Sequence, residues 1–308
     1  MKQPKNYLIT VATGFIGKNI LKKIKKKNNK IYYIYRNKKL NFKKPNIVGI
    51  KINLENLNEI NKLKDIMGSI NTVIHCANLA HNKYSINRIK KINYLATIHL
   101  AKIAKNFNIK KFIFLSTAKI NMDYNNIINN ENNISQNIKC DIYTKVKYET
   151  EIKINKIFKS SKVHCIILRP ALVYGINVKG NLKKIGTLAN FNLPLPFANA
   201  IEKKSFCSIN NLTKCINIIL INPIKSNTFL VCDDENLSFK DILVQAYKKN
   251  KNKIILFPIK LFIFKFIFYL IKKKDIYNSI FSRMILDNSK IKKELNIKLS
   301  HNLYNTKY

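Results

Sequence analysis

The chain has 308 residues, 46% of them hydrophobic, which is enough to bury one large core or a core with a smaller partner domain. It carries 57 Lys and Arg against 16 Asp and Glu, a formal net charge of +41. Such a charge is typical of proteins that bind nucleic acid or anionic membranes. The lysines are spread along the whole chain, however, and no basic stripe with interleaved aromatics occurs, so we expect no specific nucleic-acid partner.

The six cysteines form no C-x-x-C pair and no Cys/His cluster with the spacing of a zinc site. We interpret them as buried thiols of a protein in a reducing compartment, and we expect no metal site. Strand character begins at Tyr7, which leaves no room for a signal peptide. The sequence therefore predicts a cytoplasmic protein.

Strands and helices alternate through the first half of the chain. Residues 6–12 are typical of a buried strand, and a glycine turn leads from them into a helix that starts near residue 15 and ends near 27. A strand at 31–35 follows, and strand, helix, strand is the opening unit of a doubly wound parallel sheet. The alternation continues with strands at 47–52, 72–76, 111–117 and 163–168 and helices at 57–67, 86–106 and 142–157.

After residue 168 the pattern loosens. Short apolar runs at 206–209 and 228–232 alternate with helical ones, which indicates a smaller and less regular second lobe. We therefore predict an α/β protein with a Rossmann-type doubly wound parallel sheet in residues 1–168. A smaller mixed α/β C-terminal lobe is predicted in residues 169–308.

Residues 254–271 form the most apolar segment, with 15 apolar positions out of 18. As a helix the segment would reach only about 27 Å, and Lys260 and Lys265 would each cost roughly 2.5–3.5 kcal/mol inside a bilayer. It is therefore a poor transmembrane helix. We predict a buried helix of the second lobe. A membrane-surface helix is the second interpretation, since basic residues flank the segment on both sides.

Tyr143 and Lys147 lie four residues apart on the helix predicted over 142–157, so they share one face. An ammonium beside a phenol favours the ionised phenol, which lowers its pKa from about 10 and makes proton exchange near neutral pH possible. Thr117, at the carboxyl end of a predicted strand, would add a hydroxyl where such sheets bind ligands. In a lysine-rich chain, a Tyr and a Lys at this spacing can also occur by chance on a solvated helix face.

Residues 10–17 read T-V-A-T-G-F-I-G, between the first strand and the first helix. A glycine turn at this place lets the backbone approach a pyrophosphate, and the helix N-terminus supplies amide donors for it. The candidate dinucleotide contacts in this turn are Val11, Thr13, Gly14, Phe15, Ile16 and Gly17.

This turn resembles the T-G-x-x-G-x-x-G pattern of the extended short-chain dehydrogenase/reductase superfamily, in its nucleotide-sugar epimerase/dehydratase group. Val11 stands in place of the first glycine, and if that position needs a positive φ, the β-branched side chain would cost roughly 1–3 kcal/mol. Further stretches resemble the family in order. They are 73–78 (V-I-H-x-A-A in the family), 114–121 (F-L-S-S-x-K-V-N), 141–151 (P-Y-x-x-S-K-x-x-x-E), 168–175 (L-R-P-x-x-V-Y-G), 203–212 (R-R-S-x-V-x-V-D-N-L) and 286–291 (V-D-x-S-K-I).

The resemblance implies roles for individual residues. It makes Thr117, Tyr143 and Lys147 the catalytic residues. His81 would reach the sugar, and Asn181 and Lys204 would lie near the sugar diphosphate; the alternatives are loop residues for the first two and a solvated lysine for Lys204. Besides the glycine turn, the implied cofactor contacts are Asn53, Leu54, Cys76, Ala77, Asn93, Tyr143, Lys147 and Pro170.

The end of the second predicted strand bears on the choice of dinucleotide. An acidic residue there would bond the ribose hydroxyls of NAD, whereas an Arg can meet the 2′-phosphate of NADP. The position holds Tyr35 followed by Arg36. The sequence therefore leaves both cofactors open and favours NADP slightly.

The activity implied by the resemblance is C4 oxidation and reduction of a nucleotide sugar by a homodimer. The implied sugar is linked to UDP and destined for surface polysaccharides. A 4-epimerase would keep its nicotinamide bound through both half-reactions, whereas a 4-keto-sugar reductase would consume NADPH. Because Val11 and Val146 depart from the family pattern, a noncatalytic nucleotide-binding relative is a third hypothesis. Titration with a nicotinamide dinucleotide separates it from the two enzymes.

Overall fold

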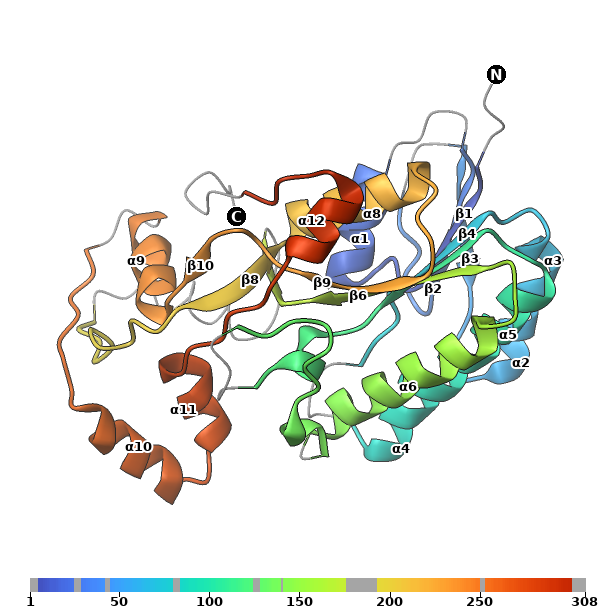
Figure 1. Ribbon diagram of the computed structural model, residues 1–308. Coiled ribbons are helices and arrows are strands. Elements are labelled where there is room, and N and C mark those ends of the chain that lie inside the picture. Colours follow the sequence, from blue (N-terminus) through green and yellow to red (C-terminus); the bar gives the residue numbers. More distant parts are fainter. Residues whose placement is uncertain are drawn as a thin grey trace.

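The computed structural model describes residues 5–24, 29–41, 45–79, 84–123, 128–139, 141–175, 193–249 and 253–300. Its centre is a seven-stranded sheet in the order β3-β2-β1-β4-β5-β6-β9, in which every neighbouring pair is parallel (Figure 1). The order reverses beside β1, as in doubly wound folds. The strands are β1 (Tyr7–Ile9), β2 (Ile31–Tyr35), β3 (Ile47–Lys51), β4 (Thr72–His75), β5 (Lys111–Leu115), β6 (His164–Pro170) and β9 (Asn227–Val231).

Helices cover both faces of this sheet (Figure 1). One face carries α1 (Phe15–Lys23), α8 (Ile209–Ile221) and α12 (Ser289–Leu295), which share one buried apolar cluster with the strands. The other face has a separate cluster. It is covered by α2 (Leu57–Asn61), α3 (Lys64–Met67), α4 (Ile86–Ile89), the π-helical segment η1 (Lys90–Ala96), α5 (Thr97–Asn106) and α6 (Ile142–Phe158).

The predicted doubly wound parallel sheet is confirmed, and its predicted strands are observed with shifts of a few residues at their ends. Two predicted helices differ in detail. The helix expected over 57–67 is divided into α2 and α3, and the one expected over 86–106 contains the π-helical turn η1. Periodicity predicts where a helix lies but does not resolve such local changes in hydrogen bonding.

A second, three-stranded sheet has the order β10-β8-β7, with β8 antiparallel to β10 and parallel to β7. The boundary predicted at residue 168 does not separate the two sheets, because β6 crosses it and β9 returns to the large sheet. The remaining elements are β7 (Leu172–Tyr174), β8 (Lys204–Ser208), β10 (Asn236–Leu237), the short 3-10 segments η2 (Ala118–Asn121) and η3 (Gln136–Lys139), α9 (Phe239–Lys249), α10 (Leu261–Leu270) and α11 (Lys274–Phe281).

The prediction of a buried helix within 254–271 is wrong. The helix α10 forms there, but only Phe264 of its ten residues is buried. The helix lies at the edge of the molecule beside α11 (Figure 1). Apolar content predicted burial, yet the second lobe supplies too few neighbours to cover the helix on all sides.

Five of the six cysteines lie in the described part of the chain and all five are free thiols, as expected; Cys140 lies outside it. No group of His, Cys, Asp and Glu among the described residues could hold a metal ion. Within the same residues, each helix is too short or too polar to cross a bilayer.

Candidate active site

Thr117, Tyr143 and the glycine turn, which are among the predicted site residues, come together at the carboxyl ends of the central strands. The turn after β1, the segment after β4 and the segment after β5 end at the same edge of the sheet, because these strands run parallel and in register. The helix α6 begins at this edge with Tyr143 in its first turn. Ligands of open α/β sheets bind at such an edge.

The turn after β1 has the backbone that a glycine would favour. Val11 has φ of 49°, which is the left-handed region that β-branched residues avoid, so the strain anticipated from the sequence is present. Gly17 allows α1 to pack tightly on this turn, since a Cβ there would lie 2.5 Å from the Val11 carbonyl oxygen. Gly14 is the N-cap of α1 and caps it with no side chain, so the first amides of the helix remain available to an anion.

Replacing Val11 with glycine is expected to raise the free energy of unfolding by about 1 kcal/mol. Relief of the roughly 1–3 kcal/mol of backbone strain exceeds the roughly 0.5–1 kcal/mol entropic cost of a glycine. Urea denaturation measures the difference. Val48→Gly is the matched control, because Val48 lies within β3 and its φ is not positive; that variant should lose stability. Equal losses in both variants would mean that the turn is not strained.

A buried hydrogen-bond chain fixes the segment after β4. The Thr10 hydroxyl accepts from the amides of Cys76 (2.9 Å) and Ala77 (3.0 Å) and lies 3.1 Å from Nδ1 of His75. On its other side, His75 Nε2 lies 2.8 Å from the Thr97 hydroxyl, which donates to a backbone carbonyl. Burial, with a smaller contribution from nearby Lys147, lowers the pKa of His75 to about 3. The ring is therefore a neutral structural link rather than a proton carrier.

Asn93, a predicted cofactor contact, holds the segment that follows β4. Its side chain is fully buried, and its amide accepts from the Leu79 amide (2.8 Å) and donates to the Leu79 carbonyl (3.1 Å). Both ends of the carboxamide are thus engaged by the segment that follows β4. The family pattern places this residue correctly near the site, but it does not reveal that the amide faces the protein.

Tyr143 is held at the start of α6 by a well-capped helix end. Asp141 is the N-cap and accepts from the Tyr143 amide (3.2 Å), while Lys119 pairs with the same carboxylate at 3.0 Å. The Tyr143 hydroxyl accepts a hydrogen bond from Asn78 Nδ2 at 2.8 Å. The Thr117 side chain also hydrogen-bonds to this phenol. The predicted pair of Thr117 and Tyr143 is therefore assembled.

The expectation of a lowered phenol pKa is wrong for the free protein. Burial raises the pKa of Tyr143 to about 12, and the negative charge of Asp141 acts in the same direction. Hydrogen bonds from Asn78 and Thr117 oppose this rise without cancelling it. Helical spacing predicted that the two side chains share a face, but the extent to which the fold desolvates the phenol does not follow from spacing.

Lys147 lies beneath the site and is fully buried. Its ammonium donates to the Leu115 carbonyl at 2.6 Å and lies 4.0 Å from the centre of the Phe114 ring. Burial lowers its pKa to about 7, while the charge of Glu151 acts against this shift. An ammonium of this kind can lose or regain its proton near neutral pH, so it is able to exchange protons as well as supply positive charge.

Asn78 is a site residue that sequence reasoning missed. It stands at the second alanine of the V-I-H-x-A-A pattern, and its carboxamide reaches the Tyr143 hydroxyl. Its Oδ1 atom is buried and has no hydrogen-bond partner among the described residues. The sequence did contain a signal for Asn78, because an amide side chain replaces the alanine methyl group of the family pattern shortly after β4.

Asn78→Ala is expected to lower kcat/KM near pH 7 by about 10- to 100-fold. The variant removes one hydrogen bond to the phenolate, a bond that is typically worth about 1.5–3 kcal/mol. The pKa of Tyr143 then rises further, so the activity should recover only at higher pH, which a profile from pH 6 to 10 measures. Asn61→Ala, which removes an amide bonded to His99, is the control. Higher activity in Asn78→Ala would mean that the amide blocks the site.

Arg36 is engaged by an acidic neighbour. Its guanidinium lies 3.3 Å from Glu55, which also pairs with Arg88 at 2.6 Å. A carboxylate at this place would repel the 2′-phosphate that distinguishes NADP. The geometry therefore gives no support to the predicted preference for NADP.

The other predicted residues differ in how they are placed. Leu54 and Ala77 are buried, as is Pro170 at the end of β6, whereas Asn53 closes a turn by accepting from the Glu55 amide. Burial raises the pKa of the partly exposed Cys76 to about 12, so this thiol stays protonated.

Lys204 is buried in β8, which excludes the interpretation as a solvated lysine. Its ammonium donates to the Asn278 carbonyl at 2.6 Å, and burial lowers its pKa to about 8. His81 and Asn181 lie outside the described residues.

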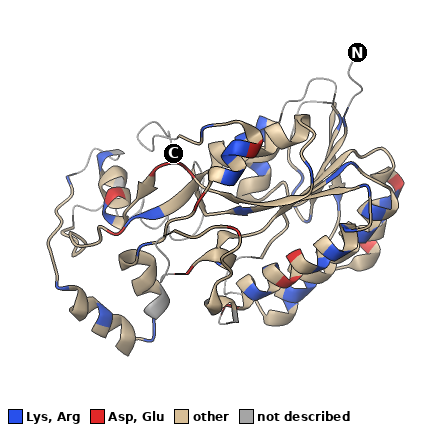
Figure 2. Ribbon diagram, in the orientation of Figure 1, with Lys and Arg blue, Asp and Glu red and all other residues tan. Residues whose placement is uncertain are grey.

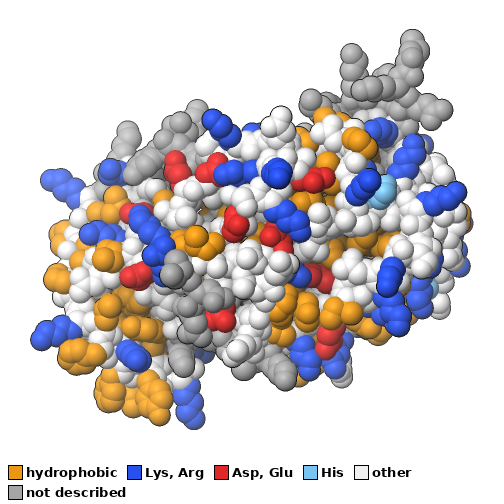
Figure 3. Space-filling model, viewed as in Figure 1, with side chains coloured by type: hydrophobic (Ala, Val, Ile, Leu, Met, Phe, Trp, Pro, Cys, Tyr) orange, Lys and Arg blue, Asp and Glu red, His pale blue; other side chains and the backbone are white. Residues whose placement is uncertain are grey.

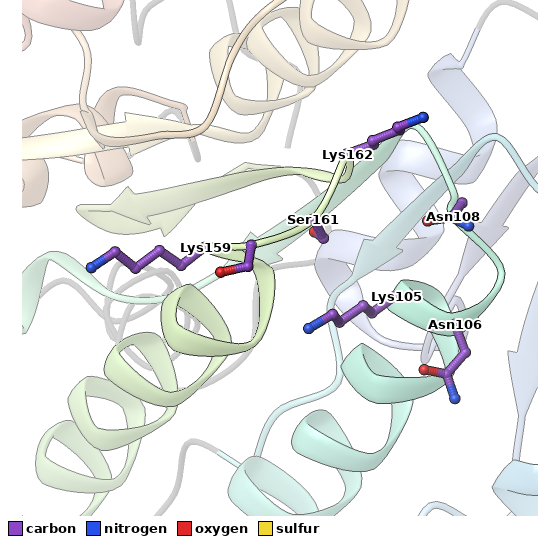
Figure 4. A pocket seen from close by; sticks show the side chains of 7 residues that line it. Lys105, Asn106, Asn108, Lys159, Ser161 and Lys162 are labelled. Atoms are coloured by element: carbon purple, nitrogen blue, oxygen red, sulfur yellow. The ribbon is translucent and has the colours of Figure 1, made fainter.

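An open hollow at the opposite edge of the sheet is not part of this site (Figure 4). It lies where α5 and α6 end and β6 begins, and it is lined by Lys105, Lys159 and Lys162 together with small polar residues. Lys162 points away from the other two lysines (Figure 4). The hollow offers no convergent set of charges for a ligand.

Comparison with known proteins agrees with this geometry. The model of the family described as "NAD dependent epimerase/dehydratase family" matches residues 7–192. UDP-glucose 4-epimerase from Vibrio cholerae is 27% identical over 304 residues, covering 96% of this chain and 90% of that relative. The match extends over nearly the whole chain.

Two solved structures from Bacillus cereus share the fold. UDP-N-acetylglucosamine 4-epimerase has a TM-score of 0.77 at 18% identity, and the match covers 98% of this chain and 96% of that enzyme's chain. UDP-glucuronic acid 4-epimerase in complex with NAD has a TM-score of 0.77 at 17% identity, and the match covers 98% of this chain and 95% of that enzyme's chain. That complex contains NAD. Because the family model matches residues 7–192, which is more than half of the chain, the chain belongs to the NAD dependent epimerase/dehydratase family.

Proposed function

We propose that this protein is a nucleotide-sugar 4-epimerase that uses NAD and a UDP-linked hexose or N-acetylhexosamine. The observation that carries the proposal is the position of the Tyr143 hydroxyl, hydrogen-bonded by Asn78 and Thr117 at the edge where α1 begins. The similarity to an epimerase along both lobes supports the reaction class. A place in the synthesis of surface polysaccharides would follow from such a substrate.

The residues of the glycine turn fit a bound dinucleotide. The uncapped amides at the start of α1 would bond the pyrophosphate, and the close packing at Gly17 keeps the turn free of a side chain there. A dinucleotide held there would supply the hydride acceptor and donor that the reaction at the sugar carbon requires.

Tyr143 would take the proton of the sugar C4 hydroxyl and later give it back. Thr117 and Asn78 would hold the phenol oxygen in position and stabilise its negative charge by donating hydrogen bonds. Lys147, with a pKa of about 7, would supply positive charge to the site and could exchange protons there. The positive charge of a bound nicotinamide would also favour the ionised phenol, in opposition to the effect of burial.

The test is incubation of purified protein with UDP-glucose and with UDP-N-acetylglucosamine, each with and without added NAD, with the products separated by anion-exchange chromatography. Formation of the C4 epimer without net reduction of NAD supports the proposal. Consumption of NADPH with a 4-keto sugar, and no interconversion of the two epimers, would identify a reductase instead. Failure to bind either dinucleotide would identify a noncatalytic relative.

A further inference from the structure

The helix α10 exposes an unusual amount of apolar surface. Phe262 is 66% exposed, Phe266 60%, Tyr269 75% and Leu270 61%. Hydrophobic side chains form a protrusion at the lower left of the molecule in Figure 3, where α10 lies in Figure 1. A helix that is apolar on all sides is normally buried in protein or lipid, and contiguous patches of this kind mark interaction sites.

The helix is nevertheless fixed to the protein on one side. Phe264 is buried, with its ring 4.8 Å from that of Phe281 and 5.9 Å from that of Phe197. Phe268 extends this contact towards Tyr277 of α11, at 6.3 Å between ring centres. The aromatic cluster holds α10 in place, so the outward-facing side chains are presented on a rigid support.

The charges around the helix indicate what covers it. Residues 253–274 contain six lysines and no acidic residue, and Lys260, Lys265 and Lys272 are exposed. Figure 2 shows lysines at both ends and in the middle of α10. A second copy of the chain placed on this face would bring two sets of lysines together, whereas an anionic lipid surface would pair with them.

The dimensions also favour a lipid surface. Ten residues extend about 15 Å along a helix axis, half of the roughly 30 Å needed to span the hydrocarbon core. A short helix with Phe and Tyr side chains and flanking lysines is instead typical of the membrane interface, where aromatic rings lie at the level of the headgroups.

We propose that α10 is a docking helix through which the protein binds reversibly to the surface of an anionic membrane, with Phe262, Phe266, Tyr269 and Leu270 inserted among the lipids. Lys260, Lys265 and Lys272 pair with the headgroups. This inference does not depend on which sugar is the substrate.

Co-sedimentation with vesicles of phosphatidylcholine alone and of phosphatidylcholine with phosphatidylglycerol (3:1) tests the proposal. The wild-type chain is expected to bind the anionic vesicles at least about tenfold more tightly, and less tightly when salt rises from about 0.1 to 0.5 M. The double variant Phe262→Ser, Phe266→Ser should lose at least about tenfold in binding. Lys260→Glu with Lys265→Glu should lose the preference for anionic vesicles.

The matched control is Leu57→Ser with Ile221→Ser, which removes exposed apolar side chains of α2 and α8 and should bind vesicles like the wild type. Sedimentation velocity without lipid shows whether α10 joins two copies. Absence of vesicle binding, equal binding to both vesicle types, or a dimer that dissociates only in the Phe262→Ser, Phe266→Ser variant would each overturn the proposal.

Discussion

Tyr143→Phe is expected to reduce epimerisation by at least about 1,000-fold while the protein remains folded. The change removes the hydroxyl that exchanges a proton with the sugar and leaves the ring in place, and general acid–base groups typically contribute about 100- to 10,000-fold. The Tyr143 hydroxyl accepts a hydrogen bond from Asn78, so Asn78 loses this partner in the variant. Turnover of a UDP-sugar at pH 7, followed by product chromatography, gives the rate.

The controls separate a lost proton donor from a disturbed fold. Thermal unfolding should differ little from the wild type, and binding of NAD, followed by fluorescence, should persist. Tyr148→Phe is a matched variant on the same helix, one turn further along and partly exposed, and it should keep full activity. Turnover of Tyr143→Phe within tenfold of the wild type would exclude this phenol as the proton carrier.

The positions of the main-sheet strands could be predicted from local patterns alone. Runs such as Phe112 to Leu115 are continuously apolar because the strands are buried on both faces, and the glycine turn marks the point where the chain reverses. The strain at Val11 could be predicted as well, because Val11 stands where the family pattern has its first glycine.

The electrostatics of the site could not be predicted in this way. The spacing of Tyr143 and Lys147 suggests a phenol with a lowered pKa. Burial instead raises the pKa of Tyr143 and lowers that of Lys147, so it favours the neutral form of both side chains. How deeply a group lies depends on elements far away in the chain. The same holds for α10, since its apolar sequence does not reveal how little of the second lobe packs against it.

Asn78 and Asn93 differ for a related reason. Both residues lie in or near the family motifs and carry a side-chain amide. The sequence pattern does not show which of the two amides bonds the backbone and which reaches a catalytic side chain. The hydrogen bonds decide, since Asn93 is bound to Leu79 and Asn78 reaches Tyr143.

The ion pair between Glu151 and Arg169 joins the inner face of α6 to the last strand beside the site. Arg169 Nη2 lies 2.5 Å from Glu151 Oε2, and both side chains are at least 94% buried. Arg169 Nη1 also donates to the side-chain oxygen of Asn121 and to the Glu131 carbonyl. A charge buried this deeply is stable only as a pair.

Glu151→Ala is therefore expected to lower the free energy of unfolding by about 3–5 kcal/mol, because it leaves a guanidinium uncompensated in the core. Urea denaturation at pH 7 measures the loss. Lys203→Ala breaks the ion pair between Lys203 and Asp241, whose side chains are 52% and 35% exposed. This variant should lower the free energy of unfolding by less than about 1 kcal/mol. The double variant Glu151→Leu, Arg169→Met removes both charges and should recover most of the loss. If Glu151→Ala costs no more than Lys203→Ala, the pair does not hold α6, and with it Tyr143 and Lys147, against the sheet.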